Sequence, residues 1–507
     1  MTRLRGGLRA GAVAGLLLLA GLLEATGVPE QVEEAAVPSI TIAVDAIPQR
    51  VHPRDPGNEA PPMLLHALYD GLLRLNAEGE PAAQLAASWE HSGDGSIYTI
   101  VLREDVLFHD GTVLDSALVR DNLADLFSGP ATPPLAPEVS DIRALDDRTV
   151  QVVFSEPYAG FPRDLSATEA LIVSGPPEAP VGTGAFLRED RDEGAAVDLV
   201  AAEGRWAGPA GVDRIRLRAV AGATARTAAL IDGRVDLIVD PPPSELEFLR
   251  VRSDLRVHSG SVRLLWAAAA NLRNGVLTER ELREAVSRAV DRSGMVRGLL
   301  PGIGAPATLP VSRAHPALRH PELRAPTRDP RRSEQILRAA GALDAPLRIG
   351  VPAGGPEDLA LQLAEALRVD LAAVGFAAEL RELSPAELTA LFESGLNEGI
   401  ELMLLPLDGI RPLSELASML HSDAPPGSHN IGGFNNQRVD SLIEDARGTA
   451  DGDERRALTH AIQEVVMQEY PWIMLVEQEQ TVAAGRGISG VELHPVAGLV
   501  LEGLGRD

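Results

Sequence analysis

Short segments of the chain alternate apolar and polar positions with a period of two. In SITIAV (39–44), Ile40, Ile42 and Val44 fall on one face, as in a half-buried β-strand. The segment VDLIV (235–239) is instead a nearly continuous apolar run that stops at three prolines, which indicates a strand buried on both faces. Together these patterns predict early strands over 39–44, 96–102, 214–220 and 235–239.

Three longer segments repeat apolar side chains at every third and fourth position, which predicts α-helices with one buried face. These helices cover 282–290, 359–371 and 458–466. Thr278 and Glu281 fit a capping box at the start of the first helix. Gly375 and Pro471 fit the ends of the other two.

Strands and helices alternate in the second half of the chain. The period-two pattern predicts strands there over 347–351, 400–405 and 472–476. Because a strand that follows a helix usually returns parallel to the strand before it, this order favours α/β domains with mainly parallel sheets.

The first residues carry an export pattern. Three arginines precede an apolar run over 10–23, and small residues follow at 25–27. A basic start, an apolar centre and a small-residue exit predict a secretory signal peptide over residues 1–27. The run is shorter than the roughly 20 residues of a spanning helix, which leaves an uncleaved membrane anchor as the alternative. We therefore expect an exported protein on the periplasmic or extracellular face of the membrane.

Composition narrows the range of functions. The 507 residues include 73 acidic and 46 basic side chains, which gives a formal net charge of −27. An acidic surface repels a phosphate backbone, so nucleic-acid binding is disfavoured. The chain contains no cysteine, which excludes disulfides, zinc–cysteine sites and a lipoprotein anchored through cysteine. It also contains no lysine, which excludes lysine Schiff bases and the Walker phosphate loop.

The sequence offers no catalytic motif. G-x-S-x-G, H-E-x-x-H and a complete G-x-G-x-x-G do not occur. His421 and His429 lie eight residues apart around two prolines, too far for one helical face, and we interpret them as solvated loop residues rather than metal ligands. We therefore expect no catalytic residue, no metal site and no cofactor.

Several segments, in order, resemble the extracellular solute-binding proteins of family 5, which serve peptide and nickel importers. Residues 68–116 are similar to the most recognisable stretch of that family, with its YDGL turn, A-x-S-W pair and FHDGT turn. TIAVDAIPQRVHP (41–53) resembles the opening strand and loop, and VGTGAF (181–186) resembles the return strand. ELREAVSRAVDRSGMV (281–296) and residues 434–477 resemble later helices and the final strand. The order and spacing of these matches are more specific than any one of them.

The resemblance implies an α/β, two-lobe periplasmic-binding-protein-like fold (type II, cluster C) with an extra subdomain inserted in lobe I. Carried over to this chain, lobe I covers 38–66, 180–262 and 478–507, the inserted subdomain covers 67–179, and lobe II covers 263–477. In such proteins the ligand is enclosed as the lobes close, and the closed form docks on a membrane permease.

The resemblance also implies residues that line the cleft between the lobes. Asn271 falls where the family carries a cleft-lining Asn, although such a residue also caps its own loop. Trp266 would offer a stacking wall, with burial in the core as the alternative. The loop after the first strand, with Asp45 and Gln49, faces the cleft by the same resemblance.

The chain departs from the family where peptide binders hold the amino terminus of their ligand. Those proteins carry G-W-x-x-D after a lobe II strand, whereas this chain reads LLPLDGIRPLSEL (404–416), with Leu407 and Ile410 at the Trp and Asp positions. Asp408 would replace the missing Asp after a loop shift, with a turn role as its alternative, and Arg411 would meet a ligand carboxylate. An ordinary peptide with a free amine is therefore in question.

These observations favour the non-catalytic substrate-binding component of an ABC importer. We expect a monomer that captures a small peptide or peptide-like solute by closure of two lobes and delivers it to an ABC permease. The alternatives are an enzyme that reuses the scaffold on a small metabolite, and a sensory or chaperone role toward an exported partner. Retention of a ligand without turnover separates the first reading from the second, and binding to a permease separates it from the third.

Overall fold

The computed structural model describes residues 39–507 except 56–59, 77–78, 130, 134–135, 191–195, 354–357, 398, 409–411 and 450–451. The predicted signal peptide, residues 1–27, lies outside this part. The described residues belong to one compact unit. Within them, no helix combines the length and the apolar composition needed to cross a bilayer.

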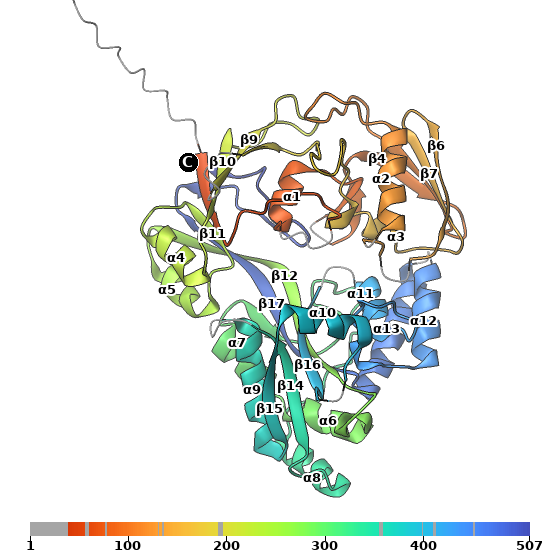
Figure 1. The fold of residues 1–507 in the computed structure, drawn as a ribbon, viewed down its shortest axis with the longest axis vertical. Helices are drawn as coiled ribbons and strands as arrows, with labels where there is room; N and C mark the ends of the chain where they lie inside the picture. The colour runs from red at the N-terminus through yellow and green to blue at the C-terminus, as the bar shows by residue number, and fades with distance from the viewer. Residues whose placement is uncertain are drawn as a thin grey trace, which may run out of the picture. The chain divides into compact units, whose positions relative to one another are not determined.

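A mixed sheet of eleven strands organises this unit (Figure 1). Ten strands follow one another across it, and β13 (Gly304–Pro306) pairs with β17 beside that path. In order across the sheet, the ten are β15 (Ala377–Leu383), β14 (Pro346–Pro352), β16 (Leu402–Asp408), β12 (Leu255–Ala270), β17 (Trp472–Gly485), β11 (Leu237–Val239), β1 (Ser39–Val44), β10 (Arg214–Ala219), β9 (Ala196–Ala201) and β8 (Phe186–Asp190).

The strands β12 and β17 join two parts of this sheet. One part contains β11, β1, β10, β9 and β8, and the other contains β16, β14 and β15. β12 has 16 residues and β17 has 14, and they pair antiparallel along most of their lengths. At one end β17 pairs with β11, and at the other end β12 pairs with β16. Their pairing is irregular between Ser259 and Leu264, where the register shifts twice. A β-bulge of this kind bends a strand, so the chain changes direction between the two sheet parts at this point. The predicted boundaries after 262 and 477 fall inside β12 and β17.

The expectation of mainly parallel sheets is wrong. Within the described part of the main sheet, β1 is parallel to β10 and β11, and β14 is parallel to β15 and β16. The other six pairings are antiparallel. The reason is that β12 leads the chain out of one sheet part and β17 brings it back, while β8, β9 and β10 follow one another as an antiparallel meander.

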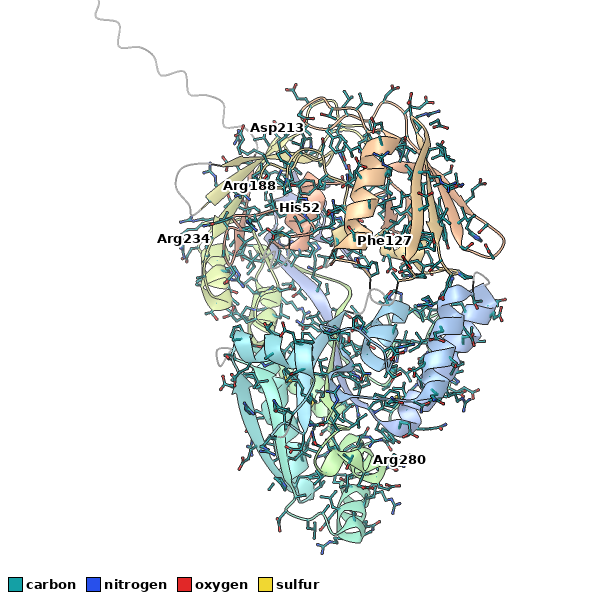
Figure 2. All side chains as sticks on the ribbon, turned by 45° about the vertical axis from the view of Figure 1, so that its right-hand side comes forward. His52, Phe127, Arg188, Asp213, Arg234 and Arg280 are labelled. Atoms are coloured by element: carbon teal, nitrogen blue, oxygen red, sulfur yellow. The ribbon has the colours of Figure 1, made fainter. Side chains whose placement is uncertain are left out.

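A second, antiparallel sheet lies within the segment 67–179. Its strands are β4 (Ala86–His91), β5 (Ile97–Leu102), β7 (Thr149–Phe154) and β6 (Val139–Asp146), in that order across the sheet. The helix α2 (Ser116–Ser128) packs on it and brings Phe127 (labelled in Figure 2) against Phe154, with ring centroids 5.7 Å apart. Phe161 completes this aromatic core at 5.0 Å from Phe154. This sheet therefore has a core of its own, separate from that of β1 and its neighbours.

Helices cover both parts of the main sheet. Around β1 and β11 lie α1 (Pro62–Leu68), α4 (Ala223–Ile231) and α5 (Leu246–Val251), whereas α3 (Phe161–Asp164) belongs to the segment of the second sheet. The helices of the other part are α6 (Arg280–Ala289), α7 (Arg292–Leu299), α8 (Pro330–Ala340), α9 (Leu359–Val374), α10 (Pro385–Ser394), α11 (Pro412–Leu420), α12 (Gln437–Gly448) and α13 (Gly452–Glu469).

The predicted strands and helices are present, but one predicted cap is wrong. Gly375 ends α9 with a φ of 107°, the left-handed conformation expected of a glycine at a helix C-terminus. Thr278 does not cap α6, because its hydroxyl donates to the carbonyl of Gly275 at 2.9 Å inside the preceding turn. Glu279 occupies the N-cap position of α6 without a side-chain bond.

Candidate functional site

A pocket of about 510 Å³ opens where the parallel strands β1 and β11 end. Binding sites of α/β sheets lie at such carboxyl ends, because the loops that follow neighbouring strands diverge there and leave a crevice. Val44 and Val239, the last residues of β1 and β11, form the bottom of the pocket, and the start of α1 forms one wall. Most of the remaining wall is apolar, from Ala43, Ala46, Pro48, Pro61, Pro62, Met63, Pro495, Val496, Ala497 and Leu499.

Gln480 supplies the pocket with an amide. It lies on β17 and is 6% exposed, and its side chain forms no hydrogen bond with another described residue. Gly498 leaves room for this amide, since a Cβ at that position would lie 2.9 Å from the Gln480 Nε2. An amide that no neighbouring residue engages, and that is open to the pocket, retains the capacity to donate and to accept hydrogen bonds. We therefore identify Gln480 as the main polar group that this pocket offers to a ligand.

Asp45 stands at the rim of the pocket as a fixed carboxylate. Its Oδ1 accepts hydrogen bonds from the Gly222 N–H at 3.1 Å and from Arg226 at 2.7 Å. The bond from Gly222, together with Arg226, holds the pKa of Asp45 below its usual range against a smaller opposing effect of burial. The carboxylate is therefore charged at neutral pH, and Arg226 compensates its charge.

Asp240 connects the pocket to β17 through two hydrogen bonds. Its backbone N–H donates to the carbonyl of Thr481 at 2.8 Å, and its Oδ1 accepts from the Thr481 N–H at 3.1 Å. Its φ of 46° is unusual for a residue with a Cβ. Strained conformations of this kind persist where surrounding bonds determine them, and they gather at functional sites.

Among the predicted site residues whose side chains the structure describes, Asp45 lines this pocket. Gln49 lines a different pocket of about 900 Å³, next to His52 and Asn122. Asp408 ends β16, paired with Leu264, and its side chain is not among those described. Arg411 lies outside the described residues. The roles of Gln49, Asp408 and Arg411 in binding remain predictions.

The amide of Asn271 is fully used by its own surroundings. Its Nδ2 donates to the carbonyls of Asn397 at 3.0 Å and Ile400 at 2.9 Å. Its Oδ1 accepts from the N–H groups of Arg273 at 3.0 Å and Asn274 at 3.1 Å. No hydrogen-bonding capacity is left for a ligand, so the geometry supports the loop-capping alternative.

Trp266 is buried in the core of the part of the main sheet that contains β16, β14 and β15. It packs among residues of β12, β17 and the helix α6, and its indole N–H donates to the Gln478 Oε1 at 2.9 Å. The geometry therefore supports the core alternative for Trp266. Sequence reasoning missed Gln480, which carries no motif. Its place in the same pocket as Asp45 depends on the pairing of β17 with β11, which no local pattern indicates.

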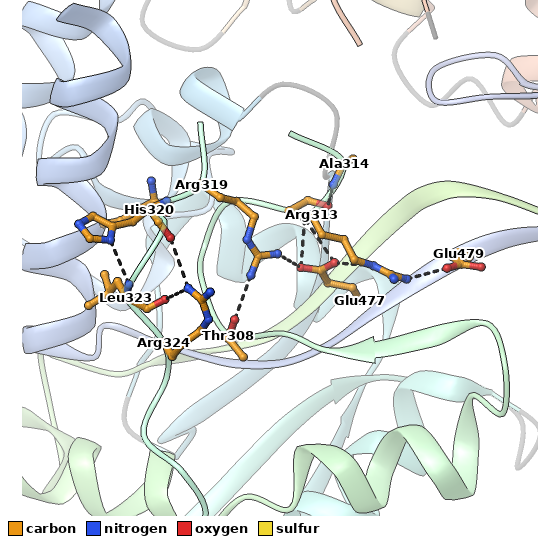
Figure 3. Close-up of polar contacts among 11 residues, drawn as sticks. Thr308, Arg313, Ala314, Arg319, His320, Leu323, Arg324, Glu477 and Glu479 are labelled. Carbon is orange, nitrogen blue, oxygen red and sulfur yellow. Dashed lines mark hydrogen bonds and ion pairs between the residues drawn. The ribbon is translucent and has the colours of Figure 1, made fainter. Parts of the chain in front are cut away.

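A buried carboxylate holds the loop after β13 against β17 (Figure 3). Glu477, which is fully buried, pairs with Arg313 and Arg319 at 3.0 Å each. Arg319 also donates to the Thr308 hydroxyl at 2.9 Å, and Arg313 reaches Glu479 at 2.7 Å. Burial raises the pKa of Glu477, and the two guanidinium groups oppose this shift. This network fixes the part of β17 that leads into Gln480.

The interpretation as solvated residues is wrong for His421, whereas His429 is partly exposed, with 27% of its side chain accessible. His421 is buried, with its Nε2 3.3 Å from the Glu444 carboxylate. His429 lies 3.2 Å from both Glu415 and the Ser418 hydroxyl, and burial lowers its pKa to about 4. His421 therefore links the end of α11 to α12, and the ring of His429 contacts α11 from the loop that follows it. Among the described residues, no three His, Cys, Asp or Glu side chains form a group able to hold a metal ion.

Comparison with known proteins adds independent information. Residues 80–404 match the sequence profile of the bacterial extracellular solute-binding proteins, family 5. A curated relative, the glutathione-binding protein GsiB of Escherichia coli K12, is 25% identical over 490 residues, which cover 92% of this chain and 94% of GsiB.

Solved structures show the same fold. NikA from Brucella suis, in complex with Fe(III)-EDTA, superposes with a TM-score of 0.83 at 19% identity over 93% of this chain and all of NikA. A dipeptide-binding protein from Pseudoalteromonas sp. SM9913, in complex with Met-Leu, gives 0.79 at 18% identity over the same shares of the two chains. These likenesses confirm the predicted two-lobe α/β fold.

Proposed function

The chain belongs to the bacterial extracellular solute-binding proteins of family 5, and we propose that it captures a peptide or peptide-like solute for an ABC importer. Closure of two lobes encloses the solute, and the closed form delivers it to a membrane permease. The protein acts by binding and release, without catalysis.

One observation carries this proposal: an amide with no hydrogen-bond partner among the described residues faces a pocket beside the strands that join the two sheet parts. Gln480 lies on β17, close to the irregular pairing of β12 and β17 between Ser259 and Leu264. A ligand that bonds to Gln480 therefore sits next to the segment that bends when the lobes move. Contact between ligand and hinge links occupancy to closure, since a ligand shifts a conformational equilibrium only through different contacts in its two states.

The pocket fits a solute with a peptide group and a compact apolar part. The amide of Gln480 pairs in both directions with a peptide N–H and C=O, and the proline-rich wall accepts an aliphatic side chain. Asp45 is already compensated by Arg226, so it offers little to a free ammonium group. Glutathione binding by GsiB and the Met-Leu complex of the dipeptide-binding protein are consistent with such a ligand class.

We propose the same boundaries that the resemblance implied. Lobe I comprises 38–66, 180–262 and 478–507, with the subdomain 67–179 inserted, and lobe II comprises 263–477. We also propose that the protein is a monomer outside the cytoplasm. Residues 1–27 direct its export, and it carries no cysteine-linked lipid.

The first experiment compares native and denaturing mass spectra of the gently purified protein. The proposal is supported by a solute that is bound one per protein molecule in the native spectrum and is released chemically unchanged on denaturation. Added back, it raises the melting temperature, because it binds only the folded state. If no solute is found and added peptides emerge chemically altered, the enzyme alternative replaces the proposal.

A variant pair tests the pocket itself. Gln480→Leu removes the amide at nearly constant volume and is expected to weaken solute binding by about tenfold, the value of one or two buried hydrogen bonds. Gln468→Leu, on the exposed face of α13, is the matched control and leaves affinity unchanged. Equal affinities of the two variants would place the solute elsewhere.

A further inference from the structure

A second pocket, of about 360 Å³, is lined by three arginines. It lies between the hairpin of β2 (Leu73–Leu75) and β3 (Pro81–Ala83), the loop after β9, and the C-terminal segment. We call it the arginine pocket, and its charged or aromatic lining residues are Arg74, Arg103, Arg205, Trp206 and Glu502. It shares no lining residue with the pocket at Gln480. Three cationic groups against one carboxylate are notable in a chain with a net charge of −27.

Arg205 is the buried base of the arginine pocket. Its side chain is 7% exposed. One terminal nitrogen pairs with Glu502 at 2.7 Å, and the other lies 3.5 Å from the buried Asp70. Its Nε is buried and has no hydrogen-bond acceptor among the described residues. Because this Nε is closed off from solvent, Arg205 contributes its positive charge to the pocket rather than this donor.

Trp206 fixes the wall of the pocket. Its indole N–H donates to Asp70 at 2.9 Å, and Asp70 also accepts bonds from Thr183 at 3.0 Å and Gln84 at 2.7 Å. The guanidinium of Arg103 lies 5.0 Å from the indole centroid, and that of Arg205 lies 5.9 Å from it. One indole thus positions two cations through favourable contacts with its π-system.

The outer two arginines keep donors available. Arg103 uses its Nε to donate to the carbonyl of Gln84, and its terminal nitrogens have no acceptor among the described residues. Arg74 is exposed and forms no hydrogen bond or ion pair with any described residue. Guanidinium groups suit oxyanions, because their donors form a planar fork that meets two oxygens at once.

We propose that the arginine pocket binds a small oxyanion, a phosphate or a carboxylate group. Arg205 supplies positive charge at the base, and Arg103 and Arg74 donate from the rim. Trp206 holds Arg103 and Arg205 in place through its indole. The site is separate from solute capture at Gln480 and does not depend on it.

The test uses inorganic phosphate and succinate as probes. Calorimetric titrations of the full chain are run at constant ionic strength, with chloride as the background anion, and Trp206 fluorescence provides a second readout. We expect saturable binding of at least one probe. The double variant Arg74→Gln with Arg103→Gln is expected to weaken binding by about tenfold or more while the melting temperature stays unchanged.

Two further variants test the specificity of the binding and the role of Trp206. Arg234→Gln removes an exposed arginine that pairs with Asp232 on the loop after α4 (Figure 2), and it should bind the probe like the parent. Trp206→Phe removes the indole that positions Arg103 and Arg205, so it should abolish the fluorescence change and weaken the binding that calorimetry detects. Preference for phosphate or for succinate identifies the oxyanion class, and either supports the proposal. Absence of saturable binding, or equal binding by the double variant and Arg234→Gln, overturns it.

Discussion

Glu156 and Arg447 form an ion pair of 2.7 Å across 291 positions of sequence. The Ala159 N–H donates to the Arg447 carbonyl at 2.8 Å nearby, and the Ser414 hydroxyl donates to Asp164 at 3.2 Å. These contacts join the segment around α3 to α11 and α12. They link the segment of the second sheet to α11 and α12, and they can open without unpairing β12 and β17.

Removal of this ion pair should favour the open form. Arg447→Gln is expected to increase the radius of gyration measured by small-angle X-ray scattering and to weaken solute binding by up to about fivefold, because an exposed ion pair contributes about 1 kcal/mol or less. Arg338→Gln, which breaks a pair within α8, is the control. Identical scattering of the two variants would show that the pair does not influence closure.

Loss of the buried carboxylate at Glu477 should destabilise the fold. Glu477→Gln leaves Arg319 and the more exposed Arg313 without their buried partner, which is expected to cost about 2–3 kcal/mol in the free energy of unfolding. Urea denaturation measures this change. The neighbouring variant Glu479→Gln removes the partly exposed pair with Arg313 and should cost less than about 1 kcal/mol. Equal losses would contradict the central role of Glu477.

Gly182 allows two chain segments to touch. A Cβ at this position would lie 1.9 Å from the carbonyl oxygen of Leu68, an atom of the backbone that cannot rotate away. Gly182→Ala is therefore expected to lower the unfolding free energy by about 3 kcal/mol or to prevent folding. Gly93→Ala meets no atom within 4 Å and should change stability by less than about 0.5 kcal/mol. Thermal melting of both variants checks the contrast.

His429 should make the protein less stable in acid. Burial lowers its pKa from 6.5 to about 4, so the folded state takes up the proton less readily than the unfolded state. Its contribution to stability is present above about pH 6.5 and is lost as the pH falls toward 4, by up to about 1.4 kcal/mol per pH unit in that range.

The measurement is urea denaturation at several pH values between 7 and 4. His66, which burial also holds neutral, contributes in the same direction. For this reason His429→Gln should reduce the slope of stability against pH without abolishing it. A slope equal to that of the parent would show that His429 does not titrate as its burial requires.

Local patterns predicted the elements well, because each depends on side chains close in sequence. The alternation over 39–44 and the glycine after α9 required no knowledge of distant residues. The cap at Thr278 failed for a local reason as well, since its hydroxyl prefers the carbonyl of Gly275 in a turn that the pattern did not indicate. The site was less predictable. Asn271 and Trp266 proved to be engaged in internal hydrogen bonds.

The sequence by itself determined the secondary structure, the absence of cysteine and lysine chemistry, and, through ordered motifs, the two-lobe fold. Only the tertiary structure decided which polar groups remain available. Gln480 faces a pocket because β17 pairs with β11 and Gly498 lies beside it. The Nε of Arg205 has no acceptor within the described part of the chain because Asp70 and Glu502 reach only its outer nitrogens. Hydrogen-bond satisfaction depends on distances of a few ångströms between residues hundreds of positions apart, and no local pattern records those distances.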